Sequence, residues 1–316
     1  MSPRLPFLLR LLLAQENVLL GGQAVLEGVM MRSPGAFAVA VRRPDGEIAY
    51  LAERAAAWTR RHPLLRLPVV RGAVTLVQTL GLGIRALNFS TEQAFPEEAR
   101  GKDGSAAGPG IWVSLGLALL LGIGLFFVVP LAATEGIRRL WPPLGGGIAY
   151  NLVDGLIRGL IFLAYVWAIG RIPDIGRLFR YHGAEHKVVH AWEAGRGMDV
   201  ATVQGYPVLH PRCGTSFLLF VMVVSILVFC FIPAAWPAWG KALARIALVP
   251  LIAGLSYELI RFSARHRDRA LARLLVLPGL ALQRLTTGQP DDSMVEVSLA
   301  AFRRTAELEG DERFVL

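Results

Sequence analysis

Long apolar stretches without charge dominate the middle of the chain. One runs from Gly104 to Thr134, and its centre, Ile111 to Ala133, is long enough to cross a bilayer as a helix. A second uncharged stretch runs from Cys213 to Gly240, with Phe217 to Ile232 as its apolar core. The pattern predicts two membrane-spanning helices at these places.

Two further stretches are weaker candidates for spans. Ile148 to Gly170 is apolar except for two charged residues, and Ala242 to Ile260 has a charged residue near each end. Short turns at Trp141-Pro142-Pro143 and Trp236-Pro237-Ala238 join each apolar run to the next. We therefore expect about four transmembrane helices in two hairpins. Two spans with interfacial or re-entrant segments is the alternative.

The region before these spans has a different pattern. Phe37, Val39 and Val41 alternate with small or polar neighbours, and Pro44-Asp45-Gly46 provides a turn before the next alternating run. This alternation predicts a small β-hairpin region. Farther along, Val69 to Phe89 is apolar with single polar interruptions, which predicts a helix lying on the membrane surface.

These patterns predict a mostly α-helical polytopic membrane protein with a small N-terminal β-hairpin region and cytoplasmic interfacial helices. The expected division is an interfacial helix at 1–20, a β-rich region with a membrane-surface helix at 21–96, a linker at 97–109, a first transmembrane hairpin at 110–170, a His-rich loop at 171–212, a second transmembrane hairpin at 213–262 and a basic tail at 263–316.

Composition supports a membrane protein. The 316 residues are 54% hydrophobic and only 18% charged, whereas soluble domains carry about 25% charge. This excludes a disordered chain and argues against a purely soluble one. The net charge of +9 favours an anionic bilayer surface as the partner over nucleic acid, for which the chain has no recognition motif.

Basic residues also predict the orientation. They gather in the loop between the two hairpins and after the last span, while the turns inside the hairpins hold few. The positive-inside rule then places both termini and the His-rich loop in the cytoplasm. The N-terminal Leu-rich run lacks a convincing cleavage site and is interrupted by Gln15, Glu16 and Asn17, so we expect an interfacial helix rather than a signal peptide.

The His-rich loop carries the most distinctive chemistry. Within Tyr181 to Lys187, His182 and His186 are one turn apart if the segment is helical, the spacing with which two imidazoles bind one divalent metal. Glu185 stands beside them and is the candidate general base that activates water. The string is H-x-x-E-H, the inverted zinc-protease pattern.

Crowding of further ligand types strengthens this hypothesis. Four of the six histidines lie within 29 residues, the last being His210, and Cys213 follows shortly before the third apolar run. We expect a divalent metal, zinc being favoured, with His210 or Cys213 joining the pair. Glu258 is expected to complete the site, to hydrogen-bond a ligating histidine, or to pair with Arg261. The alternative is that the histidines pack or cap a helix at the membrane surface.

Other ionisable residues have competing interpretations. Asp154 and Arg158 are four residues apart inside an apolar run, so they can neutralise each other on one helix. Together with Glu258 they could instead line a polar path in a transporter, the least favoured hypothesis. Glu27 follows the glycines of the β region and is either part of the site or a surface residue at a strand end.

Several motifs resemble one known family. They are Gly21 to Arg32, Tyr181 to Lys187, His210 to Phe217, Ser256-Tyr257-Glu258, and Gln283 to Thr287 followed by Pro290-Asp291-Asp292. Over about residues 20 to 300 the chain resembles the YqhQ-like bacterial membrane proteins, a family catalogued as a domain of unknown function whose members are commonly labelled predicted metal-dependent enzymes. The resemblance implies a bacterial inner-membrane location. It also places the family's signature residues at His182, Glu185, His186, His210, Cys213 and Glu258.

The leading hypothesis is thus a multi-pass inner-membrane protein with a cytoplasm-facing metal site that hydrolyses an undefined substrate. The alternative is a non-catalytic assembly or scaffold factor, with a structural metal in the His-rich loop and other membrane proteins as partners.

Overall fold

The computed structural model describes residues 20–310 apart from 56–57, 61, 97–115, 119, 146, 212, 234–235 and 266–269. The interfacial helix expected at 1–20, except for its last residue, and the linker expected at 97–109 lie outside the described residues. The described residues form a small β-sheet near the N-terminus and helices over most of the remaining length.

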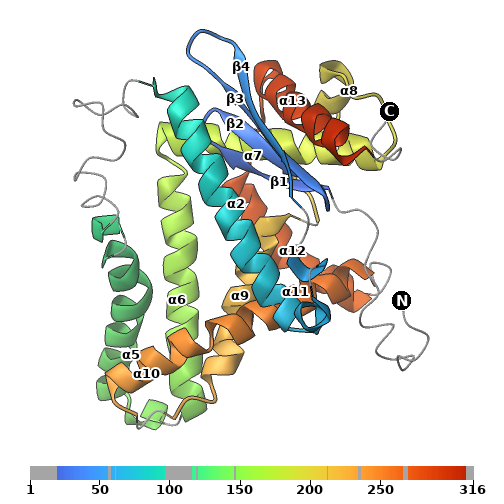
Figure 1. Ribbon diagram of the computed structural model, residues 1–316. Helices are drawn as coiled ribbons and strands as arrows, with labels where there is room; N and C mark the ends of the chain where they lie inside the picture. Colours follow the sequence, from blue (N-terminus) through green and yellow to red (C-terminus); the bar gives the residue numbers. More distant parts are fainter. Residues whose placement is uncertain are drawn as a thin grey trace, which may run out of the picture.

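The N-terminal region is a four-stranded antiparallel meander (Figure 1). Its strands are β1 (Gly21–Val25), β2 (Gly28–Arg32), β3 (Ala36–Arg42) and β4 (Ile48–Arg54), in the order β1-β2-β3-β4. The predicted hairpin is β3 and β4, and its turn contains Gly46 with a φ of +89°. The rest of the β-rich region expected from residue 21 is a second hairpin, formed by β1 and β2.

The helical elements follow the sheet. They are η1 (Trp58–Arg60), η2 (Pro63–Arg66), α2 (Val70–Ala94), η3 (Gly124–Val128), α5 (Val129–Leu140), η4 (Pro142–Gly145), α6 (Gly147–Ile169), α7 (Pro173–Glu193), α8 (Val200–Gln204), α9 (Gly214–Phe229), α10 (Ala238–Ala247), α11 (Val249–Arg265), α12 (Ala270–Thr286) and α13 (Asp292–Glu309).

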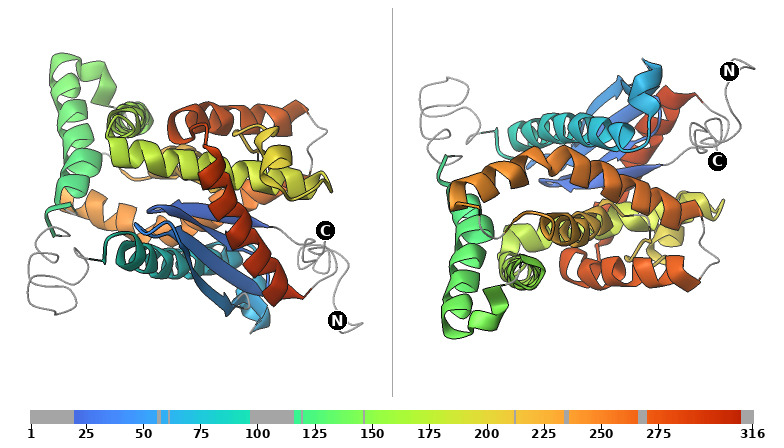
Figure 2. Two further views of the ribbon diagram at one scale, coloured as in Figure 1. Left: turned by 90° about the horizontal axis from the view of Figure 1, so that it is seen from above. Right: turned by 90° about the horizontal axis from the view of Figure 1, so that it is seen from below.

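Both faces of the sheet are covered. Phe37, Val39 and Val41 pack with Leu82 and Ala86 of α2 on one face. The other face packs against α7 and α13 through a cluster that joins Val29, Met31 and Ala40 to residues of the two helices, among them Tyr181, Val188, Met294 and Phe302. On β3, small residues point to the face that α13 covers and large residues point to the face that α2 covers. Helix α13 lies across the sheet in the view from above (Figure 2).

This packing joins distant parts of the chain. The sequence predicted a separate basic tail at 263–316, but α13 is a core helix of the sheet assembly, with Met294, Val295 and Val297 fully buried. Its N-cap, Asp291, accepts a hydrogen bond from the Met294 N–H at 3.0 Å. The first and last described elements therefore form one unit with α7.

The remaining helices extend away from the sheet assembly as a bundle (Figure 1). Two helices are long and apolar enough to cross a membrane, Gly116–Leu140 and Gly147–Ile169. A bent pair, Trp239–Ala247 and Val249–Ser263, adds a third candidate if its two parts, which meet at 44°, form one span. The class is thus mostly helical with a small sheet and two or three candidate spans.

The predicted spans match the structure unevenly. The helical stretch that ends at Leu140 and the hairpin it forms with α6 agree with the first predicted pair. In the second pair, the uncharged stretch from Cys213 to Gly240 contains only the shorter apolar helix Phe217–Phe229, since the helix ends at Cys230 and a new one begins after Pro237. The count of four spans is therefore not reached by length and composition alone.

A pair of glycines allows α2 to lie against α11. A Cβ added to Gly72 would lie 2.9 Å from the Cα of Gly254, and one added to Gly254 would lie 2.4 Å from the Val69 carbonyl oxygen. The two backbones therefore approach more closely than any larger residue permits. This contact fixes the sheet-covering helix to the bundle.

We predict that Gly72→Ala lowers the thermal unfolding temperature of the protein in detergent, because the new methyl group forces α2 away from α11. Gly81→Ala on the same helix is the matched control, since a Cβ there has nothing within 4 Å. The control is expected to unfold at the wild-type temperature or above it. The reason is that alanine in a helix interior is more favourable than glycine by up to about 1 kcal/mol. Equal unfolding temperatures for the two variants would contradict the close approach.

Candidate metal centre

Helix α7 carries the central residues of the site. Pro173 occupies its first turn, where a missing N–H costs no hydrogen bond, and Gly195 follows its end with a φ of +60°. Every residue from Tyr181 to Val189 is buried, because the sheet, α13 and the loop before α9 surround this half of the helix. Side chains of α7 that would ordinarily face water are therefore held in the interior.

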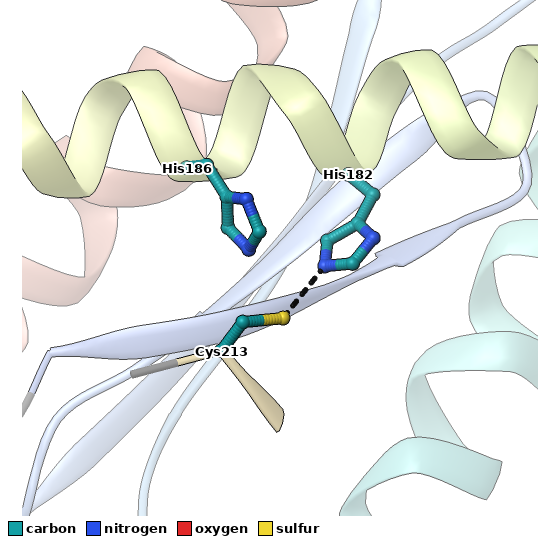
Figure 3. Close-up of side chains that lie close together, drawn as sticks. All are labelled: His182, His186 and Cys213. Carbon is teal, nitrogen blue, oxygen red and sulfur yellow. Dashed lines mark hydrogen bonds between the residues drawn. The ribbon is translucent and has the colours of Figure 1, made fainter. Parts of the chain in front are cut away.

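His182, His186 and Cys213 converge on one point. Their ligand atoms, an imidazole nitrogen from each histidine and the Cys213 sulfur, all lie within 4.8 Å of one another. The Nε2 atom of His182 is 3.1 Å from the Cys213 Sγ (Figure 3). Both histidines lie on the same face of α7, one turn apart as the H-x-x-E-H spacing predicted, and Cys213 approaches from the start of α9 (Figure 3).

Backbone carbonyl groups orient both imidazole rings. His182 Nδ1 is 2.8 Å from the Thr286 carbonyl oxygen, and His186 Nδ1 is 2.5 Å from that of Val208. A carbonyl oxygen only accepts, so each Nδ1 carries the proton and each Nε2 of a neutral ring carries the lone pair. This arrangement, with the outer nitrogen bonded to a carbonyl, is typical of metal-ligating histidines.

The His186 ring is held neutral. It is 1% exposed, and burial, with the neighbouring His182 as a smaller cause, lowers the pKa of His186 to about 2. Its Nε2 is buried and has no hydrogen-bond partner among the described residues. A buried lone pair that points toward a thiol and a second imidazole is the donor a metal ion requires.

Cys213 is the N-cap of α9. Its sulfur accepts a hydrogen bond from the Thr215 N–H at 3.3 Å and lies 3.1 Å from the Thr215 hydroxyl. The positive end of the helix dipole at this position favours negative charge on the sulfur. Two imidazoles and a sulfur so placed form a donor set suited to zinc.

Glu185 lies beside these residues, between α7 and β1. Its side chain is 6% exposed, and its Oε2 is 3.6 Å from His186 Nε2. Burial raises the pKa of Glu185 to about 7, although His182 and a hydrogen bond from the Gly22 backbone lower it. A Cβ at Gly22 would lie 3.1 Å from the Glu185 Cγ and 2.2 Å from the Met30 carbonyl oxygen. Glycine at this position thus lets β1 contact the carboxylate.

His210 lies next to the cluster rather than in it. Its ring centroid is 5.7 Å from that of His186 and 4.5 Å from that of His190. The His210 Nε2 is 3.4 Å from the Glu193 Oε1. Of the two residues expected as third donor, Cys213 is the one that the structure groups with the two histidines.

Glu258 lies in an ion pair instead of the cluster. Both its carboxylate oxygens accept hydrogen bonds from Arg71, one of them from Nε at 2.6 Å. The Val69 N–H adds a longer bond at 3.4 Å. Of the three roles considered for Glu258, an ion pair is the one observed, and its partner is Arg71 on α2. Arg261, the expected partner, is a nearby positive charge. Glu258 is therefore not among the grouped donors.

Glu27 also pairs with an arginine. It occupies the tight turn between β1 and β2 with a φ of +49° and is bonded through both carboxylate oxygens to Arg177 of α7. The Tyr181 hydroxyl is 3.3 Å from the same carboxylate, and burial, aided by Glu27, raises the pKa of Tyr181. Glu27 thus anchors the sheet to α7 and is not one of the grouped residues.

Gln283 positions the loop that delivers Cys213. Its side-chain amide makes two hydrogen bonds of 2.8 Å to the backbone of His210, accepting from the N–H and donating to the carbonyl group. Gln283 is fully buried. The sequence pattern did not indicate this role, although Gln283 begins one of the motifs that carried the family resemblance.

Gly183 brings the Thr286 carbonyl to His182. A Cβ at Gly183 would lie 2.0 Å from the Gly288 carbonyl oxygen, and the Gly288 N–H donates to the Phe179 carbonyl at 2.8 Å. The segment after α12 therefore lies directly on α7. No sequence signal other than the position of this glycine inside the motif indicated the contact.

Comparisons with known proteins support the family resemblance. The family model described as "Protein of unknown function (DUF1385)" matches residues 67–308. The "Uncharacterized protein YqhQ" of Bacillus subtilis (strain 168) is 33% identical over 298 residues, covering 92% of this chain and 92% of that protein. No solved structure matches the chain. The chain belongs to the DUF1385 family.

We predict that Gly183→Ala separates α7 from the Gly288 segment and so disrupts the histidine orientation. Gly176→Ala on the same helix is the control, because a Cβ there would meet its nearest atom at an ordinary 3.7 Å. The measurement is the amount of zinc that each zinc-loaded protein retains after dialysis against a weak chelator. We expect Gly183→Ala to bind zinc at least about tenfold more weakly than the wild type, and Gly176→Ala to bind zinc as tightly as the wild type. Equal retention would contradict the positioning role.

Proposed function

We propose that the protein is a membrane-associated hydrolase that uses one divalent metal ion, zinc being favoured, held by His182, His186 and Cys213. The observation that carries the proposal is the orientation of the two imidazoles. Backbone carbonyls accept hydrogen bonds from both Nδ1 atoms, and His186 Nε2 is buried near Cys213 Sγ without a hydrogen-bond partner among the described residues.

The number of donors favours a catalytic site over a structural one. Structural zinc sites usually have four protein ligands, whereas catalytic sites have three and keep a position for water or substrate. The donors grouped in the described chain are three. When bound, the metal would act as a Lewis acid and promote formation of a hydroxide nucleophile at neutral pH.

The chain's own residues supply the remaining chemistry. Glu185 is close enough to the cluster, with its Oε2 3.6 Å from His186 Nε2, to accept a proton from attacking water and return it to a leaving group. The Gly22 N–H holds the carboxylate in place. The Thr286 and Val208 carbonyls hold the rings and increase the basicity of the donor nitrogens.

The location indicates a substrate presented by the membrane. Cys213 begins α9, whose Phe217–Phe229 segment is apolar, and α7 begins shortly after the candidate span Gly147–Ile169 ends. The cluster is therefore at the boundary between the helical bundle and the sheet assembly (Figure 1). Under the predicted orientation this boundary faces the cytoplasm at the inner membrane of a bacterium. A lipid, lipid-linked or membrane-protein substrate fits that place.

A scaffold with a structural metal is the second candidate, and one observation favours it. The cluster joins α7 to the start of α9, and its outer hydrogen bonds extend to α12 and the loop before α9. A metal there would hold these segments together without catalysis. The transporter hypothesis stays the least favoured, because Asp154 and Arg158 lie in one ion-paired group and Glu258 lies in another.

Metal content tests the site itself. We predict about one zinc or similar ion per chain in detergent-purified wild-type protein and loss of that ion in the double variant His182→Ala/His186→Ala, measured by elemental mass spectrometry. His62→Ala, at an exposed position before η2, is the control and should keep the metal. Substoichiometric metal in the wild type after zinc supplementation would overturn both candidate functions.

Glu185→Gln distinguishes the enzyme from the scaffold. The substrate is first sought by screening phosphoesters, esters and peptides. The variant should keep the metal but hydrolyse that substrate at least about a hundredfold more slowly than the wild type, because the amide cannot accept the proton. Asp174→Asn, exposed in the first turn of α7, is the control for removal of a carboxylate. Full activity of Glu185→Gln, or full complementation in cells that depend on the protein, would favour the scaffold.

A further inference from the structure

Three charged side chains meet inside the helical bundle. Arg158 of α6 and Arg245 of α10 both donate to the same carboxylate oxygen, Asp154 Oδ2, at 2.6 and 2.9 Å. Their side chains are 13%, 3% and 1% exposed for Arg158, Arg245 and Asp154. The sequence predicted the pair on α6, and the structure adds Arg245. We call these three residues the arginine–aspartate triad.

The triad has an unbalanced positive charge. Two guanidinium groups face one carboxylate, and no other acidic side chain forms an ion pair with either arginine in the described chain. Asp154 lies roughly 10 Å along α6 from Gly147, inside a helix long and apolar enough to span a membrane. A buried charge without a counter-ion is costly there, so a structural ion pair accounts for only part of the group.

Hydrogen-bond donors are also in excess. Among the described residues, the Nε atoms of Arg158 and Arg245 are buried without an acceptor, and the second carboxylate oxygen, Asp154 Oδ1, is buried without a donor. Even with both oxygens accepting, one carboxylate cannot satisfy all the N–H donors of two guanidinium groups. One aromatic ring holds both in place, since the Phe229 centroid is 5.5 Å from the Arg158 Cζ and 5.2 Å from the Arg245 Cζ.

The two helices that carry the triad also expose apolar side chains. Leu156 and Leu160 on α6 are 63% and 67% exposed, and Leu243 and Ile246 on α10 are each 62% exposed. Leu156 and Leu160 each follow a triad residue of α6 by two positions, so they lie on the opposite face of that helix from the triad. A molecule with an anionic head and acyl chains therefore matches the charge of the triad and the apolar helices that carry it.

We propose that the triad is a binding site for the phosphate group of an anionic membrane lipid, with Asp154 as the counter-ion of the arginines when no lipid is bound. Planar guanidinium groups bind phosphate oxygens through paired N–H donors, and Arg158 remains partly exposed to receive them. Lys241, one turn before Arg245 on α10, adds a further positive charge. The site is separate from the metal cluster and does not depend on it.

Lipid titration tests this proposal. Full-length protein in a neutral detergent is titrated with phosphatidylglycerol, with phosphatidylcholine and with inorganic phosphate, and bound lipid is counted by native mass spectrometry. We expect Arg245→Gln and Arg158→Gln each to weaken phosphatidylglycerol binding by about tenfold or more. Arg139→Gln, a removal of positive charge at a side chain 79% exposed on α5, is the control and should bind as the wild type does.

Asp154→Asn separates an anion site from a structural ion pair. If Asp154 competes with the lipid phosphate for the arginines, the variant binds phosphatidylglycerol more tightly than the wild type. Weaker binding, or binding unchanged in both arginine variants, would overturn the proposal. If Arg245→Gln fails to fold, Arg158→Lys provides the second measurement, since it keeps the charge and loses the paired donors. Binding of inorganic phosphate as tight as that of lipid would overturn the lipid assignment.

Discussion

The enclosure of α7 is the constraint on which the rest of the structure depends. The second half of this helix is buried between the sheet, α13 and the loop before α9, so its histidines and Glu185 lie in the interior instead of facing water. Buried polar groups must find partners, and here backbone carbonyls of Val208 and Thr286 supply them. Those two hydrogen bonds determine which nitrogen of each ring points inward.

Close backbone approaches make this enclosure possible. Gly22 lets β1 reach Glu185, and Gly183 lets the segment after α12 lie on α7. Gln283 then holds the backbone of His210, three residues before Cys213. The thiol therefore reaches the histidines through contacts among four segments that are far apart in sequence. The same contacts connect the sheet assembly to the helical bundle.

The sequence predicted the local part of the candidate site well. His182, Glu185 and His186 share one helix, so their spacing alone indicates which of them face the same way. The choice of Cys213 over His210, and the pairing of Glu258 with Arg71, depend on how distant segments pack, which periodicity does not report. The partner of Asp154 shows the same limit, because Arg158 is four residues away whereas Arg245 lies on another helix.

The fold was predictable to a similar extent. Alternation at Phe37, Val39 and Val41 correctly indicated a strand, and the β-rich region expected from residue 21 contains β1 and β2. Their hairpin was not specified, because β2 is buried on both faces and so has no alternating pattern. The role of α13 in the core was missed because its partner strands lie more than two hundred residues earlier.

X-ray absorption spectroscopy at the zinc edge tests the central claim most directly. Protein loaded with one equivalent of zinc should show one sulfur ligand at about 2.3 Å and two imidazole nitrogens at about 2.0–2.1 Å, with a lighter atom in the remaining position. The sulfur signal should disappear in Cys213→Ser. A spectrum without sulfur in the wild-type protein, or one with several sulfur ligands, would contradict a centre built from His182, His186 and Cys213.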